Sequence, residues 1–159
     1  MKAYLGLGSN IGDSHANILA AIENLKGSGT IEKVSSFYKT EPVGLAEQPW
    51  FVNCAAVLET ELPPEELLTE AKRIEKELGR TSAARNGPRV IDIDILLYEH
   101  IIVKTGSLTV PHPRLHERRF NLLPLSEIAP DAVHPVFERT IIGLLGELKD
   151  SHACEKLLH

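Results

Sequence analysis

Residues 87–97 alternate isoleucines with aspartates, and this pattern strongly limits the local structure. In an extended strand successive side chains point to opposite faces, so Asp92 and Asp94 share one face. The other face carries a row of apolar side chains: Ile91, Ile93, Ile95 and Leu97. The two carboxylates are then roughly 6.5 to 7 Å apart along the strand. Like charges at that spacing resist burial unless a cation lies near them.

The alternation alone leaves two interpretations of this pair open. In one, the strand lies at the edge of a sheet and the aspartates are solvated; in the other, they hold a divalent metal ion. The preceding residues favour the second, because arginines crowd positive charge beside the aspartates at Arg80, Arg85 and Arg89. Metal ions and guanidinium groups together neutralise a polyphosphate, so this segment predicts a site for a metal-bound phosphate ester or anhydride.

The overall charge argues against a nucleic-acid partner. The chain of 159 residues has 17 Lys and Arg against 22 Asp and Glu, a net charge of -5, whereas nucleic-acid binding depends on a basic face. The apolar stretches are short, which predicts neither a signal peptide nor a membrane-spanning helix. Cys54, in an apolar run, reads as a small core residue, and Cys54 and Cys154 fit a reducing compartment. We therefore expect a cytoplasmic protein with no membrane partner.

The order of the predicted elements indicates an α+β fold. Apolar periodicity and turn residues predict strands at 3–7, 31–39, 51–59 and 90–98, with helices at 14–26 and 63–78. This β-α-β-β-α-β order fits a ferredoxin-like antiparallel sheet with helices in its crossovers. A small hairpin is expected at 101–110, and additional C-terminal helices, at 121–128 and 140–149, should lie on the other face. We expect one domain over residues 1–159, whose last residues pack as a polar end or fray.

Glycines and prolines mark two further features. Gly6, Gly8 and Gly12 are similar to a dinucleotide-binding fingerprint, but their spacing is one residue too long, and we interpret them as turn geometry. Residues 40–50 form a loop too long for a tight hairpin. Its prolines, its glycine and Trp50 suggest a flap that covers a ligand.

Several motifs occur together in this chain: GLGSN at 6–10, SSFYKTEP at 35–42, QPWFVN at 48–53, GPRVIDIDIL at 87–96 and VPHPR at 110–114. Together they resemble the 6-hydroxymethyl-7,8-dihydropterin pyrophosphokinase family of the folate pathway, over residue 3 to about residue 130. The motif at 87–96 is highly specific, whereas the N-terminal glycines alone are weak. Members of this family transfer diphosphate from ATP to the hydroxymethyl oxygen of the pterin and release AMP.

The resemblance implies two magnesium ions and a nucleotide site. It makes Asp92 and Asp94 the metal ligands, which agrees with the preference of a small, hard cation for carboxylates. It implies that ATP is bound by Glu75, Arg80, Arg85, Arg89, His112 and Arg118, with Ile95 or Leu108 beside the adenine. Arg80 and Arg89 are expected to act in catalysis with the two aspartates. The loop that holds Arg85 is one residue shorter than in other members, which makes that assignment less direct.

The same resemblance implies a pterin pocket. Two aromatic side chains, Phe51 and Phe120, are expected to enclose the flat bicycle by stacking. Asn53 would bind its edge, because a carboxamide offers both a donor and an acceptor. The pocket is completed by Asp92 and by the start of the long loop, at Thr40, Pro42 and Val43.

Other interpretations stay open on the residues alone. A lone arginine is usually a solvated surface charge, Glu75 also fits a helix-surface partner for a lysine, and Phe51 and Phe120 also fit core aromatics. Paired aspartates serve metal-dependent phosphohydrolases and nucleotidyltransferases too, and ferredoxin-like sheets occur in RNA-binding modules. Asn86 and Pro113 depart from the family pattern close to the expected ATP site, which puts nucleotide affinity and loop closure in doubt. The oligomeric state is left open, with a monomer slightly favoured.

Overall fold

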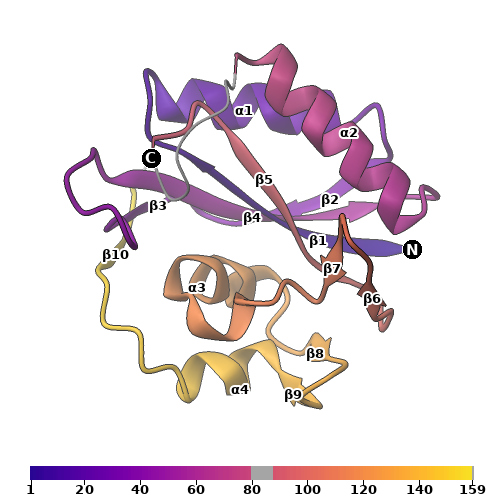
Figure 1. Ribbon diagram of the computed structural model, residues 1–159. Helices are drawn as coiled ribbons and strands as arrows, with labels where there is room; N and C mark the ends of the chain where they lie inside the picture. The colour runs from indigo at the N-terminus through magenta and orange to yellow at the C-terminus, as the bar shows by residue number, and fades with distance from the viewer. Residues whose placement is uncertain (80–87, 159) are drawn as a thin grey trace.

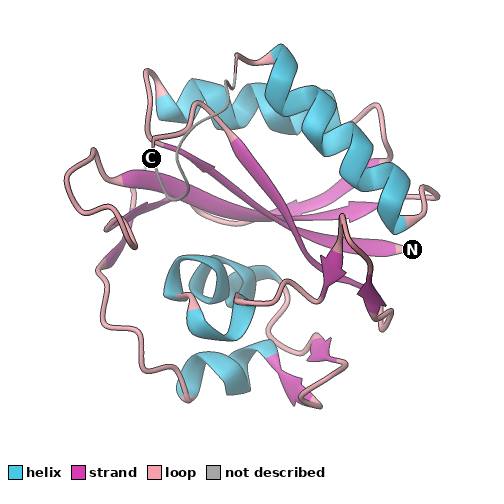
Figure 2. Cartoon of the chain, viewed as in Figure 1, coloured by secondary structure: helices cyan, strands magenta, loops and turns pink. Residues whose placement is uncertain are grey.

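The computed structural model describes residues 1–79 and 88–158, and an antiparallel sheet forms its centre (Figure 1, Figure 2). Its strands run in the order β10-β3-β4-β1-β5, and β2 also pairs with β4. Every neighbouring pair is antiparallel. The strands are β1 (Lys2–Ser9), β2 (Thr30–Val34), β3 (Tyr38–Thr40), β4 (Phe51–Glu59), β5 (Asp92–Tyr98) and β10 (Cys154–Lys156). The predicted α+β, ferredoxin-like arrangement is therefore confirmed.

The helices α1 (Ser14–Leu25) and α2 (Pro64–Glu77) cover one face of the sheet (Figure 1). Asp13 caps α1 by accepting a hydrogen bond from the backbone N–H of Ala16, and proline and two glutamates occupy the first turn of α2. The apolar face of the sheet and the stripes of both helices form the larger core, which includes Leu5, Leu7, Ile18, Leu58, Ile74 and Ile93. The helix predictions for this part of the chain are confirmed.

The opposite face carries the C-terminal half of the chain. Here lie a 3-10 turn (Leu115–Glu117), α3 (Arg119–Ile128), α4 (Ile141–Gly146) and the short hairpin of β8 (Val133–His134) with β9 (Arg139–Thr140). The hairpin of β6 (Val103–Lys104) with β7 (Thr109–Val110) instead packs against the larger core, beside α2. A smaller apolar core joins α3 and α4 to the sheet through Ala55, Leu96, Leu97, Leu122, Leu125 and Ile141. This layer covers only part of the sheet face and leaves one end of it open to a cavity (Figure 1).

The predicted strand at 31–39 is two strands, because a serine interrupts its pairing with β4. The backbone N–H of Ser35 donates to the carbonyl of Ala55, and its hydroxyl accepts from the N–H of Ala55. A serine side chain that bonds the backbone in this way replaces part of the regular ladder. Residues 35–37 therefore lie between β2 and β3.

The predicted strand at 90–98 begins later, at Asp92, and carries a β-bulge. Tyr4 pairs with Leu97 but Leu5 pairs with Ile95, so Leu96 is an extra residue on β5. Leu97 consequently belongs to the smaller core and Tyr98 to the larger one. The expectation that Leu97 shares a face with the isoleucines is wrong, because the alternation of side chains shifts at the bulge.

The C-terminal segment differs from the prediction. The helix expected at 140–149 ends at Gly146, and the following chain crosses to the sheet and adds β10 beside β3. The backbone N–H of Leu157 extends this contact by donating to the carbonyl of Phe37. The end of the chain is thus part of the sheet rather than a frayed tail. No helix in the described ranges is long and apolar enough to cross a membrane.

Candidate active site

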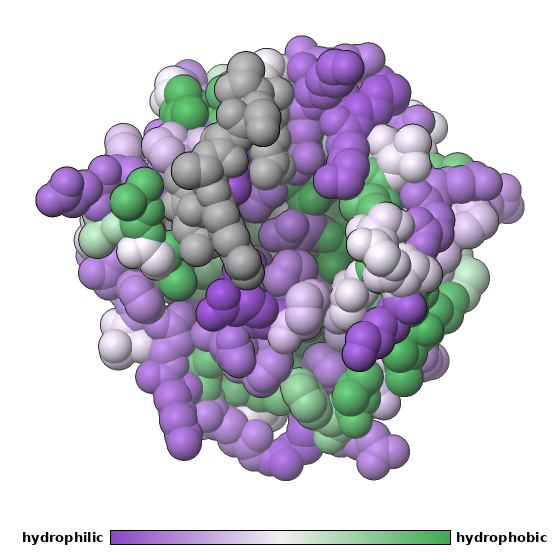
Figure 3. All heavy atoms as spheres, viewed as in Figure 1, coloured by the Kyte–Doolittle hydropathy of each residue, from purple (hydrophilic) through white to green (hydrophobic). Residues whose placement is uncertain are grey.

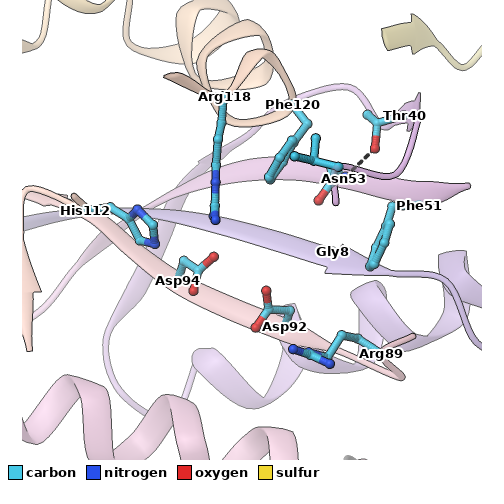
Figure 4. A pocket seen from close by; sticks show the side chains of 11 residues that line it. Gly8, Thr40, Phe51, Asn53, Arg89, Asp92, Asp94, His112, Arg118 and Phe120 are labelled. Carbon is cyan, nitrogen blue, oxygen red and sulfur yellow. Dashed lines mark hydrogen bonds between the residues drawn. The ribbon is translucent and has the colours of Figure 1, made fainter. Parts of the chain in front are cut away.

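A cavity of about 260 Å³ opens on the α3 side of the sheet. Its lining comes from five parts of the chain: Gly8, Thr40, Val43, Phe51, Asn53, Arg89, Asp92, Asp94, His112, Arg118 and Phe120 (Figure 4). In the space-filling view the surface is hollowed near its centre, and hydrophilic side chains dominate around the hollow (Figure 3). Most of the residues predicted to bind substrate are therefore brought together at one place.

The two aspartates project from β5 into this cavity. Their alternation partners Ile91, Ile93 and Ile95 are buried in the larger core, whereas Asp92 and Asp94 are half-buried. On the neighbouring strand, Asp92 pairs with Gly8 and Asp94 with Gly6. Cross-strand partners share a face, so the side chains that lie over β1 beside the carboxylates come from other elements.

Gly6 and Gly8 correct one prediction. They are not turn residues but lie inside β1, where other side chains approach the backbone closely. A Cβ at position 8 would lie 2.4 Å from Oδ1 of Asn53, and a Cβ at position 6 would lie 3.0 Å from Oδ1 of Asn121. The glycines are required because two side-chain amides pack against this strand. Gly12, with φ of 71°, does lie in a turn.

Asn53 is buried and held in one orientation. Its Nδ2 donates to Oγ1 of Thr40 at 2.6 Å, which joins β4 to β3 beside the cavity. Thr40 and Val43 line the cavity, whereas Pro42 between them is buried and is not part of its lining. The predicted amide and threonine are thus in contact with each other.

The two predicted aromatic residues lie on different layers of the molecule. Phe51 begins β4 and Phe120 lies in the first turn of α3, and both rings project into the cavity (Figure 4). The guanidinium carbon of Arg118 lies 5.3 Å from the centre of the Phe120 ring. Both phenylalanines are partly exposed, so neither is an ordinary core residue. This arrangement suits a flat ring held between two layers.

Basic side chains surround the aspartates. Arg89 lies beside Asp92, and Arg118 reaches from α3 toward Asp94 (Figure 4). Burial lowers the pKa of Arg118, and the nearby Asp94 carboxylate acts in the opposite direction. Arginine keeps its charge under such shifts, because its ordinary pKa is very high. The site therefore offers carboxylates and guanidinium groups in close proximity, as a bound metal and phosphate chain require.

His112 lies on the same side as a neutral group. Burial, together with the positive charge of Arg118, lowers its pKa to about 4. Its Nδ1 accepts a hydrogen bond from the backbone N–H of Arg114 at 3.1 Å. A neutral imidazole that accepts at Nδ1 carries its proton on Nε2. His112 can therefore donate a hydrogen bond from Nε2 near neutral pH without adding charge.

A second cavity, of about 340 Å³, adjoins the first along β5. Asp92, Asp94 and His112 line both cavities. The remaining lining of the second comes from α2, from β5 and from the segment around β7, and includes Glu75, Ile95 and Leu108. Four residues expected at the nucleotide, Glu75, Ile95, Leu108 and His112, thus line the second cavity. Those expected beside the pterin, Pro42 excepted, line the first. Arg89 and Arg118, expected to bind ATP, line the first cavity.

Glu75 is a buried residue of α2 rather than a surface partner for a lysine. Its Oε2 accepts a hydrogen bond from the backbone N–H of Ile93 at 2.8 Å. Ile93 stands between the two aspartates, so this bond fixes the part of β5 that carries them. A buried carboxylate is costly unless it is bonded in this way.

Sequence reasoning did not assign a role to Asn10. This buried amide donates from Nδ2 to Gln48 and to the carbonyl of Pro49, and its Oδ1 accepts from the backbone N–H of Arg89. It therefore joins the loop at 41–50 to the segment before β5. The only signal was its place at the end of the GLGSN motif. The predicted residues Arg80 and Arg85, and the departure at Asn86, lie outside the described residues.

The donor set at the aspartates fits magnesium. No group of three His, Cys, Asp or Glu side chains in the described ranges is placed to hold a metal ion. Magnesium usually binds one or two carboxylates and completes its coordination with water and substrate phosphates, rather than a closed protein cage. Asp92 and Asp94, open to both cavities, have the chemistry of such a partial site.

Comparison with known proteins gives a consistent family. Residues 4–130 match the family model described as 7,8-dihydro-6-hydroxymethylpterin-pyrophosphokinase (HPPK). The chain is 46% identical over 138 residues to the 2-amino-4-hydroxy-6-hydroxymethyldihydropteridine pyrophosphokinase of Aquifex aeolicus, covering 87% of this chain and 86% of that one. It is 47% identical over 137 residues to a folic acid synthesis protein of Dictyostelium discoideum, covering 86% of this chain but only 21% of that longer protein.

A solved structure supports the fold. A crystal structure of Plasmodium falciparum HPPK-DHPS superposes with a TM-score of 0.72 at 18% identity, covering 92% of this chain and 45% of that one. At this identity the likeness speaks for the architecture alone.

Proposed function

Since the chain belongs to the 7,8-dihydro-6-hydroxymethylpterin-pyrophosphokinase family, and is thus a pyrophosphokinase of folate synthesis, we propose its substrates and the division of its site. It transfers diphosphate from ATP to the hydroxymethyl oxygen of 6-hydroxymethyl-7,8-dihydropterin and releases AMP. Asp92 and Asp94 would hold two magnesium ions, which would neutralise charge on the nucleotide's phosphates. The first cavity takes the pterin and the second takes the adenosine of ATP.

The meeting of two cavities at one pair of aspartates carries this proposal. A transfer between two substrates needs both reacting groups beside the same charged centre, and Asp92 and Asp94 line both cavities. Holding two reactants in this way removes much of the entropic barrier to their reaction. A hydrolase, in contrast, has no need of a separate aromatic cavity such as the first one.

The pterin ring lies between Phe51 and Phe120 in this proposal. Its amide edge meets Asn53, whose orientation is fixed by Thr40. A ring placed there directs its substituent toward Asp92 and Asp94, because all of these side chains project into the same cavity (Figure 4). Stacking supplies affinity for any flat ring, while the buried amide selects for a pterin-like edge.

The nucleotide lies along the other side of β5. Ile95 and Leu108 offer apolar contact to the adenine, and the phosphates extend toward the aspartates. Arg89 and Arg118 neutralise the triphosphate from the first cavity, and neutral His112 donates from Nε2 without repelling either arginine. Arg80 and Arg85, outside the described residues, remain proposed contacts of the phosphates.

The reaction is an in-line attack by the pterin hydroxyl oxygen on the β-phosphorus of ATP. The new oxygen–phosphorus bond forms as the bond to the bridging oxygen of AMP breaks. When bound, magnesium would neutralise the triphosphate and stabilise charge that develops on the leaving oxygen. The chain itself positions both substrates, excludes water with the loop at 41–50, and provides the Asp94 carboxylate as the best side-chain acceptor for the hydroxyl proton.

A product assay tests this proposal against its rivals. The protein is incubated with ATP, magnesium and 6-hydroxymethyl-7,8-dihydropterin, and the products are separated by chromatography. We expect AMP and a pyrophosphorylated pterin in equal amounts, with neither formed when the pterin is omitted. Inorganic phosphate without AMP would instead indicate a phosphohydrolase, and release of inorganic diphosphate with nucleotide attached to the acceptor would indicate a nucleotidyltransferase.

A further inference from the structure

The helix α3 is capped by a residue far away in the sequence. Its own N-cap residue, Arg118, makes no side-chain cap. Instead Oδ2 of Asp150 accepts a hydrogen bond from the backbone N–H of Arg119 at 3.0 Å. An acidic side chain at this end both satisfies an exposed donor and complements the helix dipole. The pKa of Asp150 is lowered because this bond and those from His152 outweigh the effect of its burial.

Asp150 is itself held firmly. Its Oδ1 accepts from the backbone N–H of His152 at 2.9 Å and lies 2.5 Å from Nδ1 of the same residue. Its side chain is only 10% exposed. The cap is therefore a built contact rather than a chance approach of a loose tail.

The same segment is joined to the opposite wall of the first cavity. The backbone N–H of Ala153 donates to Oε1 of Glu41, and the backbone N–H of Glu41 donates to the carbonyl of Ala153. Cys154 then pairs with Thr40 as β10 begins. Thr40 is the residue that orients Asn53.

Residues 150–156 thus connect two walls that belong to different layers. One wall is the first turn of α3, which carries Arg118 and Phe120; the other is the end of β3, which carries Thr40. In Figure 1 this segment runs along the outside of the molecule from α4 to β10. Residues 150–156 themselves follow residue 130, where the match to the family model ends.

We propose that Asp150 is a positioning residue for the pterin, which it serves by holding the first turn of α3 at a fixed distance from β3. The proposal rests on the function assigned to the first cavity. It predicts that loss of the cap changes the binding of the pterin and not that of the nucleotide's adenosine, because no residue of 150–156 lines the second cavity, where Ile95 and Leu108 lie.

The test compares two deletions of a helix cap. Asp150→Ala removes the cap of α3, and Thr140→Ala removes the matched cap of α4, where Oγ1 accepts from the backbone N–H of Gly143. Asp150→Asn serves as rescue, because asparagine caps helices about as well as aspartate. For each protein, calorimetry measures the dissociation constants of the pterin and of adenosine, which lacks the phosphates that Arg118 is proposed to bind, and thermal unfolding reports stability.

We expect both alanine variants to lower the melting temperature by about 2 to 4 °C. Asp150→Ala alone should weaken pterin binding, by roughly fivefold, with adenosine binding unchanged and Asp150→Asn close to wild type. Equal losses for both ligands, unchanged pterin binding, or the same pterin loss in Thr140→Ala would overturn the inference. If Asp150→Ala does not fold, Glu41→Ala breaks the other end of the connection and must show the same selective loss.

The wild-type titration separates the two proposals. A wild-type protein that does not bind the pterin would overturn the proposed function and this inference with it. Normal pterin binding that is insensitive to Asp150→Ala would overturn the positioning role alone.

Discussion

The two faces of the sheet carry different kinds of side chains. Toward α1 and α2 the contact is a continuous apolar layer in which Ala3, Leu5, Leu7, Ile91 and Ile95 are buried. Toward α3 the face is divided, with apolar residues such as Ala55 and Leu97 under the helix and glycines, Asn53 and the aspartates at the open end. The first face stabilises the fold and leaves the second free to carry charged groups.

The difference shows which part of the molecule offsets the unfavourable free energy of placing these charged groups in the site. Like charges beside each other and a neutral histidine between arginines do not favour folding. They are tolerated because β5 is fixed from behind by isoleucines and by Glu75. Changes on the two faces should therefore separate: one class should affect turnover and the other stability.

The largest effect should follow removal of an aspartate. Asp94→Ala deletes a metal ligand and should lower turnover by about a thousandfold or more, since metal ions supply several kcal/mol of charge stabilisation in such reactions. The melting temperature should change little, because the substitution removes repulsion between two half-buried acids together with the attraction of Asp94 to Arg118. Turnover is measured as AMP release with magnesium as the sole metal; near-normal turnover would contradict the metal site. Asp92→Ala should behave alike.

A substitution in the larger core, on the other face of the sheet, should lower stability and leave turnover nearly unchanged. Ile18→Ala empties space in the larger core, where Ile18 is fully buried, and should lower the free energy of unfolding by about 3 kcal/mol. Urea unfolding gives that value, while assays of the folded protein should find its turnover within twofold of wild type. A large loss of turnover without loss of stability would show that the two faces are not separable.

The next effect tests the division of the open face into two cavities. Phe120→Ala removes one ring of the first cavity and should weaken pterin binding by roughly tenfold, from lost stacking and buried area. A non-hydrolysable ATP analogue should bind as before, because Phe120 does not line the second cavity. Calorimetric titration of each ligand decides the point, and equal losses would count against the stacking role.

The smallest effect concerns pH and the α3 side. Nδ1 of His134 accepts from the backbone N–H groups of Val136 and Phe137, and burial lowers the pKa of this histidine. Its neutral form is therefore favoured by folding, so its contribution is complete above the ordinary pKa of about 6.5 and is lost as pH falls below it. His134→Asn keeps an acceptor and removes the titration. Urea unfolding is measured at about pH 7.5 and at about pH 5, which span the histidine range. The free energy of unfolding should decline less between these two values for this variant than for the wild type.

Periodicity and motif sufficed for much of the molecule. The alternation around Asp92 and the apolar stripes of α1 and α2 predicted their elements, because those segments are regular and amphipathic. The motif at 87–96, with Phe51, Asn53 and Phe120, predicted residues that the structure places around one cavity. These features depend on local sequence or on recognisable motifs.

What could not be predicted depends on contacts between distant residues. The bulge at Leu96 is set by pairing with β1, β10 by pairing with β3, and the burial of Glu75 by its bond to Ile93. The two glycines of β1 resemble turn residues in the sequence, because the side-chain amides that require them come from another strand and from a helix. Nothing in the local pattern around these residues indicates such partners.

The extra residue at Leu96 has a consequence for how this chain tolerates length changes. A strand has a phase, since each side chain's face depends on whether its position is odd or even, and the bulge resets that phase partway along β5. Asp94 before the bulge and Leu97 after it therefore lie on the same side of the sheet. Deletion of Leu96 would restore regular alternation, with Ile95 opposite Leu5 and Leu97 opposite Tyr4, so the acids and Leu97 would keep their side of the sheet. Deletion of a residue elsewhere in β5 would move one of these groups to the other side, so Leu96 is the position of this strand at which a shortening should be tolerated best.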